Sequence, residues 1–467
     1  MSIIFAGVSP HPPIIIPEVG KGEAAQVDKT VKSMEAWAGH VRESGPETIV
    51  IITPHGVVFR DAIAITADPH ATGDLGSFGA PELSFTRKID LELVAALLSA
   101  AQEHQLPAFP LNRELVREYH ATTDLDHGVL VPLYYLDKAG VDVPIVPIAM
   151  GLLPYEELYA FGHVIQEAAD SLGRRVAVVA SGDLSHRLTP KAPAGYAPEG
   201  AEFDQNICQA LADLDLERLL GLPKNLVEKA GECGFRPIFM VLGSLDGYAV
   251  KTTIHSYEGP FGVGYLVAEF RPSGKDPGRE LLDALFADRA ARVSQRRQRE
   301  SVLVRLARES LEMSVRGQGE AKPPSPLPPE MAKAAGVFVS IKKHGELRGC
   351  IGTIEPTQRH VAAEIMENAI SAGTRDPRFD PVTEDELDDL VYSVDVLGEP
   401  EPIESVEQLD PERYGVIVRR GHRSGLLLPN LEGIESAEEQ VAIARRKAGI
   451  KEHEPVELER FEVIRYY

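Results

Sequence analysis

Short apolar runs alternate with helical patterns over the first 270 residues of the chain. The runs are rich in β-branched residues and are bounded by turn-forming residues, which is typical of buried strands; they cover residues 3–8, 48–53, 143–150, 175–181, 250–257 and 262–270. Between them, apolar residues recur at helical spacing over residues 90–104, 155–172 and 200–222. This alternation predicts an α/β domain with a mixed or mostly parallel sheet covered by helices.

The pattern changes after residues 271–278, where proline, glycine and serine cluster. Helical spacing returns over 281–286 and 302–311, with a basic segment between them that is expected to be a solvated helix face. Beyond a proline-rich loop, the pattern predicts a hairpin, a helix and a strand over residues 336–352, 361–374 and 390–398. We therefore predict a smaller α+β second domain.

The predicted organisation is a first domain over residues 1–271, a connecting segment over 272–296 and a second domain over 297–467. A chain of 467 residues exceeds the size at which single cores usually stop growing, which agrees with two domains.

Charge and cysteine content narrow the class of protein. The formal net charge of −23 repels phosphate backbones and anionic lipid surfaces, and no apolar stretch is long enough to span a membrane. The three cysteines, Cys208, Cys233 and Cys350, are widely spaced and odd in number, which predicts neither a disulfide framework nor a structural zinc site made of thiolates. We expect a cytoplasmic protein that binds neither nucleic acid nor membranes.

Three histidines occupy matching positions. His11, His55 and His186 each come shortly after a predicted buried strand, at the edge where ligands bind in open α/β sheets. His127 precedes an apolar segment and is placed to point into the same crevice from a loop. Any one of them alone is more simply a surface or core residue. Together they favour a site, because neutral imidazoles bind divalent iron, zinc, copper or manganese.

The carboxylate that would complete such a site is Glu258, in the sequence "SYEG" at the end of the run 250–257. Two histidines and one carboxylate form the facial triad of non-haem iron oxygenases. The competing interpretation of Glu258 is a turn residue before Gly259 and Pro260.

The segments "SPHPPIIIP", "TPHG", "DHGVLVPL", "SGDLSH" and "SYEG" occur in this order, and the chain over residues 1–271 resembles the LigB-type class III extradiol ring-cleavage dioxygenases and their Memo relatives. The resemblance implies that His11, His55 and Glu258 bind the metal. It also implies that His186 is the acid/base histidine and that His127 lines the substrate site. Memo proteins carry a cysteine near the place of the carboxylate, so Glu258 favours the dioxygenase-like branch.

The implied activity is the iron(II)-dependent ring cleavage of a catechol-like substrate by dioxygen, with zinc, copper or manganese as alternative metals. His186 would take a phenolic proton and later return it. His120, in "REYHATTD", is expected to be structural. Two alternatives stay open: a Memo-like metal-binding or interaction protein without ring cleavage, and a metal-dependent hydrolase.

The second domain contains the motif "ELRGCIG", in which Cys350 is a candidate reactive thiolate beside Arg348. The alternative is a small buried cysteine in a glycine-shaped hairpin. With "SAGTRDPRFDPV", "SVDVLGEPEPI" and "RSGLLLPNLEG", the motif gives residues 297–467 a resemblance to the AMMECR-type domain. Its motif residues form one polar pocket or brace turns; they are Arg348, Gly349, Cys350, Arg375, Asp376, Arg378 and Phe379.

This second resemblance implies no defined activity. Bacterial and archaeal relatives pair the two kinds of unit, often beside radical S-adenosylmethionine proteins, which implies a shared pathway with such a protein. Fusion of the two units would keep their sites at high effective concentration.

Overall fold

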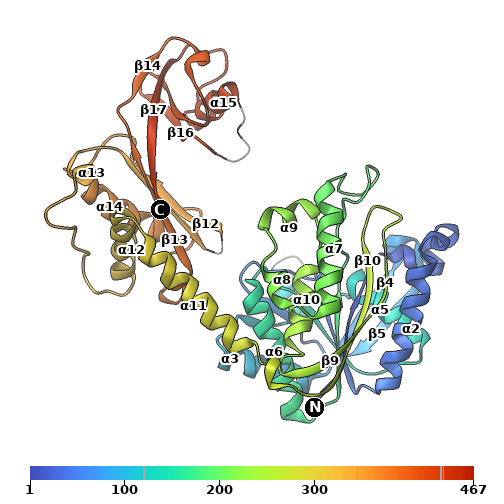
Figure 1. Ribbon diagram of the computed structural model, residues 1–467. Coiled ribbons are helices and arrows are strands. Elements are labelled where there is room, and N and C mark those ends of the chain that lie inside the picture. The colour runs from blue at the N-terminus through green and yellow to red at the C-terminus, as the bar shows by residue number, and fades with distance from the viewer. Residues whose placement is uncertain (119–121, 344, 432–433, 435) are drawn as a thin grey trace. The chain divides into compact units, whose positions relative to one another are not determined.

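The computed structural model describes residues 1–118, 122–343, 345–431, 434 and 436–467. Contacts between residues divide the chain into two compact units, Met1–Ala287 and Asp288–Tyr467 (Figure 1). The predicted connecting segment 272–296 falls on the end of a strand and on most of a helix, Leu282–Arg299.

An eight-stranded mixed sheet forms the centre of the N-terminal unit, with the strand order β6-β3-β7-β2-β8-β1-β10-β9. Its strands are β1 (Ile3–Ser9), β2 (Thr48–Thr53), β3 (Ile63–Thr66), β6 (Ala108–Leu111), β7 (Ile145–Ala149), β8 (Val176–Ser181), β9 (Tyr248–Glu258) and β10 (Tyr265–Lys275). The four central strands β7, β2, β8 and β1 are mutually parallel, whereas β10 and β9 form an antiparallel hairpin at one edge. A separate hairpin joins β4 (His70–Leu75) to β5 (Ala80–Lys88).

Helices pack on this sheet in two groups (Figure 1). The larger helices are α2 (Asp28–Ser44), α3 (Leu91–Glu103), α5 (His127–Lys138), α6 (Tyr155–Leu172), α7 (Pro198–Asp213) and α10 (Phe235–Gly243). The shorter ones are α1 (Pro17–Gly20), α4 (Arg113–Glu118), α8 (Leu216–Leu220) and α9 (Lys224–Ala230). Helix α6 contacts both α3 and α10, while α2 contacts α5. This architecture confirms the predicted α/β fold with a largely parallel, helix-covered sheet.

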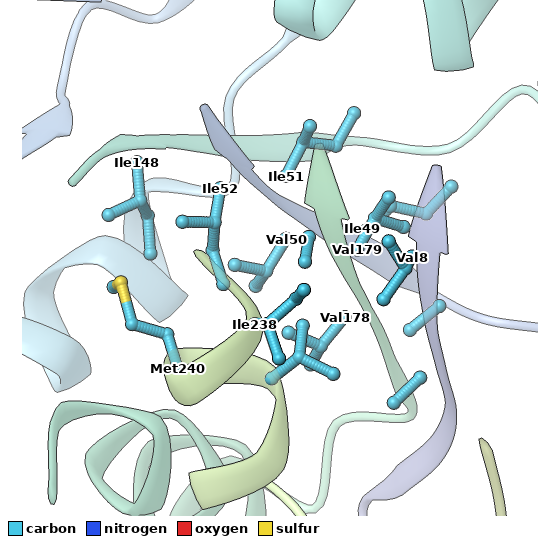
Figure 2. Packing of buried hydrophobic residues seen from close by; sticks show 14 of the residues in the cluster. Val8, Ile49, Val50, Ile51, Ile52, Ile148, Val178, Val179, Ile238 and Met240 are labelled. Atoms are coloured by element: carbon cyan, nitrogen blue, oxygen red, sulfur yellow. The ribbon is translucent and has the colours of Figure 1, made fainter. Parts of the chain in front are cut away.

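Aliphatic side chains fill the space between the sheet and the helices. Figure 2 shows Ile238 and Met240 of α10 beside side chains of the central strands, including Ile52 and Val178, and all four are fully buried. Burying one such side chain stabilises the fold by about 1.5–3 kcal/mol. On α2, Trp37 approaches β1 so closely that a Cβ on Gly7 would lie 2.5 Å from its Nε1 atom.

Every strand that the apolar runs predicted in this unit is present within five residues of its predicted ends. Helix α10 was not predicted, because eight of its nine residues are buried and it therefore has almost no polar face to give a helical period. Helices α2 and α5 and the hairpin β4–β5 were also not predicted.

The C-terminal unit contains an antiparallel sheet with the order β12-β11-β13-β17-β15-β16, in which β14 also pairs with β17. The strands are β11 (Val337–Lys343), β12 (Glu346–Gly352), β13 (Leu390–Leu397), β14 (Glu401–Ile403), β15 (Tyr414–Arg420), β16 (Arg423–Leu427) and β17 (Glu457–Tyr466). The helices of this part of the chain are α11 (Leu282–Arg299), α12 (Val302–Val315), α13 (Pro329–Ala332), α14 (Val361–Thr374) and α15 (Ala437–Lys447). The predicted α+β class is confirmed.

In the portion of the chain that the structure describes, no helix combines the length and the apolar character that crossing a membrane requires.

Candidate metal centre

The carboxyl ends of adjacent parallel strands bring the predicted histidines together. His11 and His55 each lie two residues beyond a strand, β1 and β2, and β8 separates these two strands in the sheet. Pro10 and Pro12 restrict the backbone on both sides of His11, so little conformational entropy remains to be lost when its ring is fixed. His11 is buried, whereas His55 is exposed.

Three potential ligand atoms converge at this point. The Nε2 atoms of His55 and His11 are 3.0 Å apart, and Cys233 Sγ lies 3.5 Å from His11 Nε2. All three donor atoms lie within 4.8 Å of one another. Around a tetrahedral zinc ion, two such nitrogens are separated by about 3.3 Å and a nitrogen and a sulfur by about 3.5 Å. The donor set therefore fits a transition-metal ion with only small movements.

Hydrogen bonding fixes the orientation of the His11 ring. Ser181 Oγ donates its single proton to the carbonyl oxygen of Gly128, so towards His11 Nδ1, 3.1 Å away, it acts as an acceptor. His11 Nδ1 therefore carries the ring proton, and Nε2 presents a lone pair to the other two donor atoms. This is the arrangement by which second-sphere groups orient metal-binding histidines.

Cys233 reaches the histidines because two glycines allow two loops to touch. A Cβ on Gly182, just after β8, would lie 2.2 Å from the Cα atom of Gly234, so any larger residue would push the turn that carries Cys233 away. Across this contact, the backbone N–H of Asp183 donates to Cys233 Sγ at 3.3 Å. The carboxylate of Asp183 in turn accepts the backbone N–H of His11 at 3.0 Å.

His127 and His186 lie beside these donors. The ring of His127 stacks on that of His55 at 4.3 Å between centroids, and Phe78 lies 5.3 Å from His127. His186 Nε2 is 3.7 Å from Cys233 Sγ. His127 begins helix α5, after the capping residue Asp126, rather than extending from an irregular loop.

Burial shifts the pKa values of the four histidines, Cys233 and Asp183. Desolvation lowers the pKa of His11, His55 and His186, and with the help of His55 it lowers that of His127 to about 4. The four rings are therefore neutral at neutral pH and are able to bind a metal without losing a proton. Desolvation also raises the pKa of the Cys233 thiol well above its usual range, and that of Asp183 to about 7.

Glu258, predicted as the third ligand, does not join this cluster. Its Oε1 atom accepts hydrogen bonds from the backbone N–H of Thr30 at 2.7 Å and from the Thr30 hydroxyl at 2.5 Å. These groups lie in the first turn of α2, where backbone N–H groups lack partners within the helix and a negative charge is favoured. Glu258 ends β9, which lies two strands, or about 10 Å, beyond β1.

Cysteine spacing did not point to Cys233, because the three cysteines are too widely spaced for a disulfide framework or a thiolate cluster. His11, His55 and Cys233 are far apart in the sequence, so no regular spacing marks them as a group. The available signal was the sequence "GECGF", a glycine-flanked cysteine just before a strongly apolar segment. His120 lies outside the described residues.

In the C-terminal unit, the motif residues divide into separate bonded pairs. Arg348 forms a two-point ion pair with Glu386 at 3.0 and 2.9 Å, and the exposed Arg375 pairs with Glu367 at 3.0 Å. Their guanidinium groups are therefore each engaged by a carboxylate other than Asp376.

Cys350 and Asp376 do lie together. The backbone N–H of Cys350 donates to Asp376 Oδ2 at 2.9 Å, and the Ser340 hydroxyl donates to Cys350 Sγ at 3.2 Å. Arg378 holds the same carboxylate through its Nε and Nη2 atoms at 2.9 and 2.6 Å. This bonding braces the turn after α14 against β12, and the reactivity of Cys350 stays a prediction.

Comparison with known proteins agrees with the division into two units. Residues 6–268 match the family model described as the catalytic LigB subunit of aromatic ring-opening dioxygenase, and residues 304–466 match the AMMECR1 model. A curated protein of Clostridium acetobutylicum is 42% identical over 459 residues, which are 98% of this chain and 97% of that protein.

Other relatives match only part of the chain. A Thermotoga maritima protein is 53% identical over 148 residues, which cover 31% of this chain and 85% of that protein. A solved structure from Pyrococcus horikoshii is 35% identical and covers 35% of this chain and 88% of its own, with a TM-score of 0.33. A solved Escherichia coli structure is 17% identical and covers 57% of this chain and 99% of its own, with a TM-score of 0.37.

Proposed function

Because the chain belongs to the LigB family of aromatic ring-opening dioxygenase subunits over residues 6–268 and carries an AMMECR1 domain over residues 304–466, we propose that its N-terminal unit is a metal-dependent oxidoreductase acting on a small catechol-like substrate with dioxygen. His11, His55 and Cys233 would hold the metal. The convergence of these three donor atoms within 4.8 Å is the observation that carries the proposal.

A redox-active metal in this position would bring a phenolate and dioxygen together and mediate electron transfer between them. The sequence pointed to iron(II) through a carboxylate ligand. With a thiolate in that role, the donor set also suits zinc and copper, since soft sulfur ligands favour these metals.

The remaining side chains of the site have separate tasks in this proposal. His186, whose pKa is lowered by burial, would be neutral and would accept a proton from a substrate hydroxyl at Nε2. His127 and Phe78 present ring faces and edges near His55, a surface on which an aromatic substrate would pack. Ser181 would hold His11 in the tautomer that leaves Nε2 free.

Cys233 also favours a second candidate, a metal-binding protein of this family that does not cleave rings. The argument for the dioxygenase-like branch depended on a carboxylate ligand, and the side chain of Glu258 instead accepts hydrogen bonds from Thr30 of helix α2. A buried thiolate in contact with the metal would itself be exposed to oxidation during oxygen chemistry.

Metal analysis of anaerobically purified full-length protein tests the proposed ligands. We expect one tightly bound equivalent in the wild type that is lost in Cys233→Ala and retained in Glu258→Gln. The glutamine amide oxygen still accepts the Thr30 hydrogen bonds, so that variant is a folded control. Loss of the metal in Glu258→Gln with retention in Cys233→Ala would restore the carboxylate ligand.

Oxygen consumption with a panel of catechols tests the reaction. We expect uptake of oxygen and a yellow ring-opened product, both lost in His186→Gln while the metal remains bound. A metal-loaded wild type that consumes no oxygen with any catechol would favour the second candidate, and turnover of ester or amide substrates without oxygen would favour a hydrolase.

A further inference from the structure

A second group of potential metal ligands lies outside the site of His11, His55 and Cys233. It consists of His40 on α2, His255 on β9 and Glu269 on β10, one residue from each of three neighbouring elements. We refer to it as the hairpin cluster, because two of its members belong to the antiparallel hairpin at the edge of the sheet. One ligand atom from each residue lies within 4.8 Å of the other two.

The two histidine rings of the hairpin cluster converge on one carboxylate oxygen. Glu269 Oε2 lies 2.7 Å from His40 Nδ1 and 2.9 Å from His255 Nε2, so both rings face the same oxygen atom. Glu269 is only 4% exposed, which is an unusual position for a carboxylate. The other oxygen, Oε1, accepts a hydrogen bond from Arg271 Nε at 3.1 Å.

Two imidazoles and one carboxylate are a common zinc ligand set when water supplies the fourth position. Zinc has no geometric preference from its d electrons, so it tolerates ligands from three separate elements. Ligand nitrogen and oxygen atoms around tetrahedral zinc are about 3.3 Å apart, so the side chains need to separate by about half an ångström. The side chain of His40 is 36% exposed, which gives an ion and its water access from solvent.

We propose that the hairpin cluster is a second divalent-metal site that binds zinc through His40 Nδ1, His255 Nε2 and Glu269 Oε2. Arg271 acts as the second-sphere partner that holds the carboxylate in place. Zinc competes with protons for these ligand atoms, so its binding weakens as the pH falls.

The position of the hairpin cluster gives this ion a structural role. Glu269 lies opposite Gly7 of β1 in the sheet, and Gly7 is covered by Trp37 of α2. Helix α2 is already joined to the hairpin near its first turn, through Thr30 and Glu258. Zinc at His40 would add a second connection almost three helical turns further along, and would fix the hairpin β9–β10 against α2.

Zinc titration of the full-length chain in a His55→Ala/Cys233→Ala background tests the proposal, because this background removes the first site. We expect one equivalent of zinc to remain bound. X-ray absorption of that zinc should show only nitrogen and oxygen neighbours at about 2.0–2.2 Å, without the sulfur at about 2.3 Å that the first site would give.

Adding His255→Gln or His40→Gln to this background should abolish the remaining equivalent. Glutamine still donates a hydrogen bond to Glu269, so the fold is preserved, and the fluorescence of the chain's only tryptophan, Trp37, checks this. His70→Gln, at an exposed histidine of β4, is the matched control and should leave binding unchanged. Absence of zinc in the double-variant background, or zinc that persists with sulfur-free coordination after both glutamine substitutions, overturns the proposal.

Discussion

Each unit places titratable side chains around a partly buried cysteine. Their pKa values are shifted towards the neutral forms in the N-terminal unit and towards the charged forms in the C-terminal unit. Around Cys233, burial shifts the histidines and Asp183 towards their neutral forms, and the pKa of Asp183 rises to about 7. Around Cys350, arginines engage the carboxylates. Arg378 lowers the pKa of Asp376 well below its usual range, and the pKa of Glu386 falls to about 2 because its bonds to Arg348, Thr383 and Lys343 outweigh its burial.

This difference separates a cluster of neutral donor groups from a network of paired charges. Buried titratable groups with shifted pKa values that converge at one place are typical of functional sites. Ion pairs with two-point geometry satisfy their own charges and stabilise the local fold. The comparison therefore favours metal binding in the N-terminal unit and a bracing role for the charged motif residues of the C-terminal unit.

The largest expected effect is a difference in metal affinity between substitutions of the two cysteines. Cys233→Ala removes a ligand and should weaken metal binding by more than about 100-fold, whereas Cys350→Ala should leave it unchanged. Competition with a chromophoric chelator under anaerobic conditions measures both affinities. Equal losses in the two variants would contradict the distinction between the units.

The next effect tests the orientation of His11. Ser181→Ala removes the acceptor for His11 Nδ1–H, so the ring is free to turn and to change tautomer, and metal affinity should fall by about 10–100-fold. Ser244→Ala is the matched control, because Ser244 is equally buried and donates to Val241 in a helix of the same unit. An unchanged affinity in Ser181→Ala would show that the hydroxyl does not set the position of the ring.

A third prediction concerns pH and the buried Asp204, which accepts hydrogen bonds from Ser185 N–H and Tyr257 hydroxyl. Burial raises the pKa of Asp204 to about 6 in the folded protein, above its ordinary value near 4. As the pH rises from 4 to 6, the unfolded chain loses this proton first, so the N-terminal unit loses stability.

Asp204→Asn removes this titration. Relative to the wild type, the free energy of unfolding of the variant should rise by about 2 kcal/mol between pH 4 and pH 7. Urea unfolding followed by Trp37 fluorescence reports on this unit alone, because Trp37 is the only tryptophan. A difference that does not change with pH would mean that Asp204 has the same pKa in the folded and unfolded states.

The smallest effect has the opposite sign of pH dependence. Because the folded pKa of Glu386 is about 2, its ion pairs stabilise the C-terminal unit above pH 4 and cease to do so as the pH falls towards 2. Glu386→Gln should cost about 1–2 kcal/mol at pH 7 after allowance for solvent screening, and almost nothing at pH 2.

Urea unfolding followed by far-ultraviolet circular dichroism, with Trp37 fluorescence reporting separately on the other unit, measures this cost. Glu384→Gln removes an exposed carboxylate of the same turn, which lies 3.5 Å from the Arg316 guanidinium, and should cost little. A loss of bound metal in Glu386→Gln would indicate that the ion pairs of Glu386 are coupled to the proposed metal site of the N-terminal unit.

The sequence was sufficient to predict that His11, His55, His127 and His186 meet. The three that follow strands do so because parallel strands end at one edge of a sheet, and apolar runs make those strands recognisable. His127 was placed in the right crevice but on the wrong type of element, since helix α5 is buried on nearly every side and gives no helical period.

The pattern along the chain did not show which side chain lies third beside His11 and His55. Glu258 follows a strand just as His11 does, and it ends at the same edge of the sheet, but strand order places β9 outside β10 and two strands from β1. Pairing order depends on contacts between distant segments, which hydrophobic periodicity does not record.

The sequence by itself determined the alternation of strands and helices, the two units and the histidines at the strand ends, because these depend on local periodicity and on the geometry of a parallel sheet. Only in the folded chain does Cys233 lie beside His11 and His55. It does so because the absence of side chains at Gly182 and Gly234 lets two loops, separated by about 50 residues, approach to van der Waals distance.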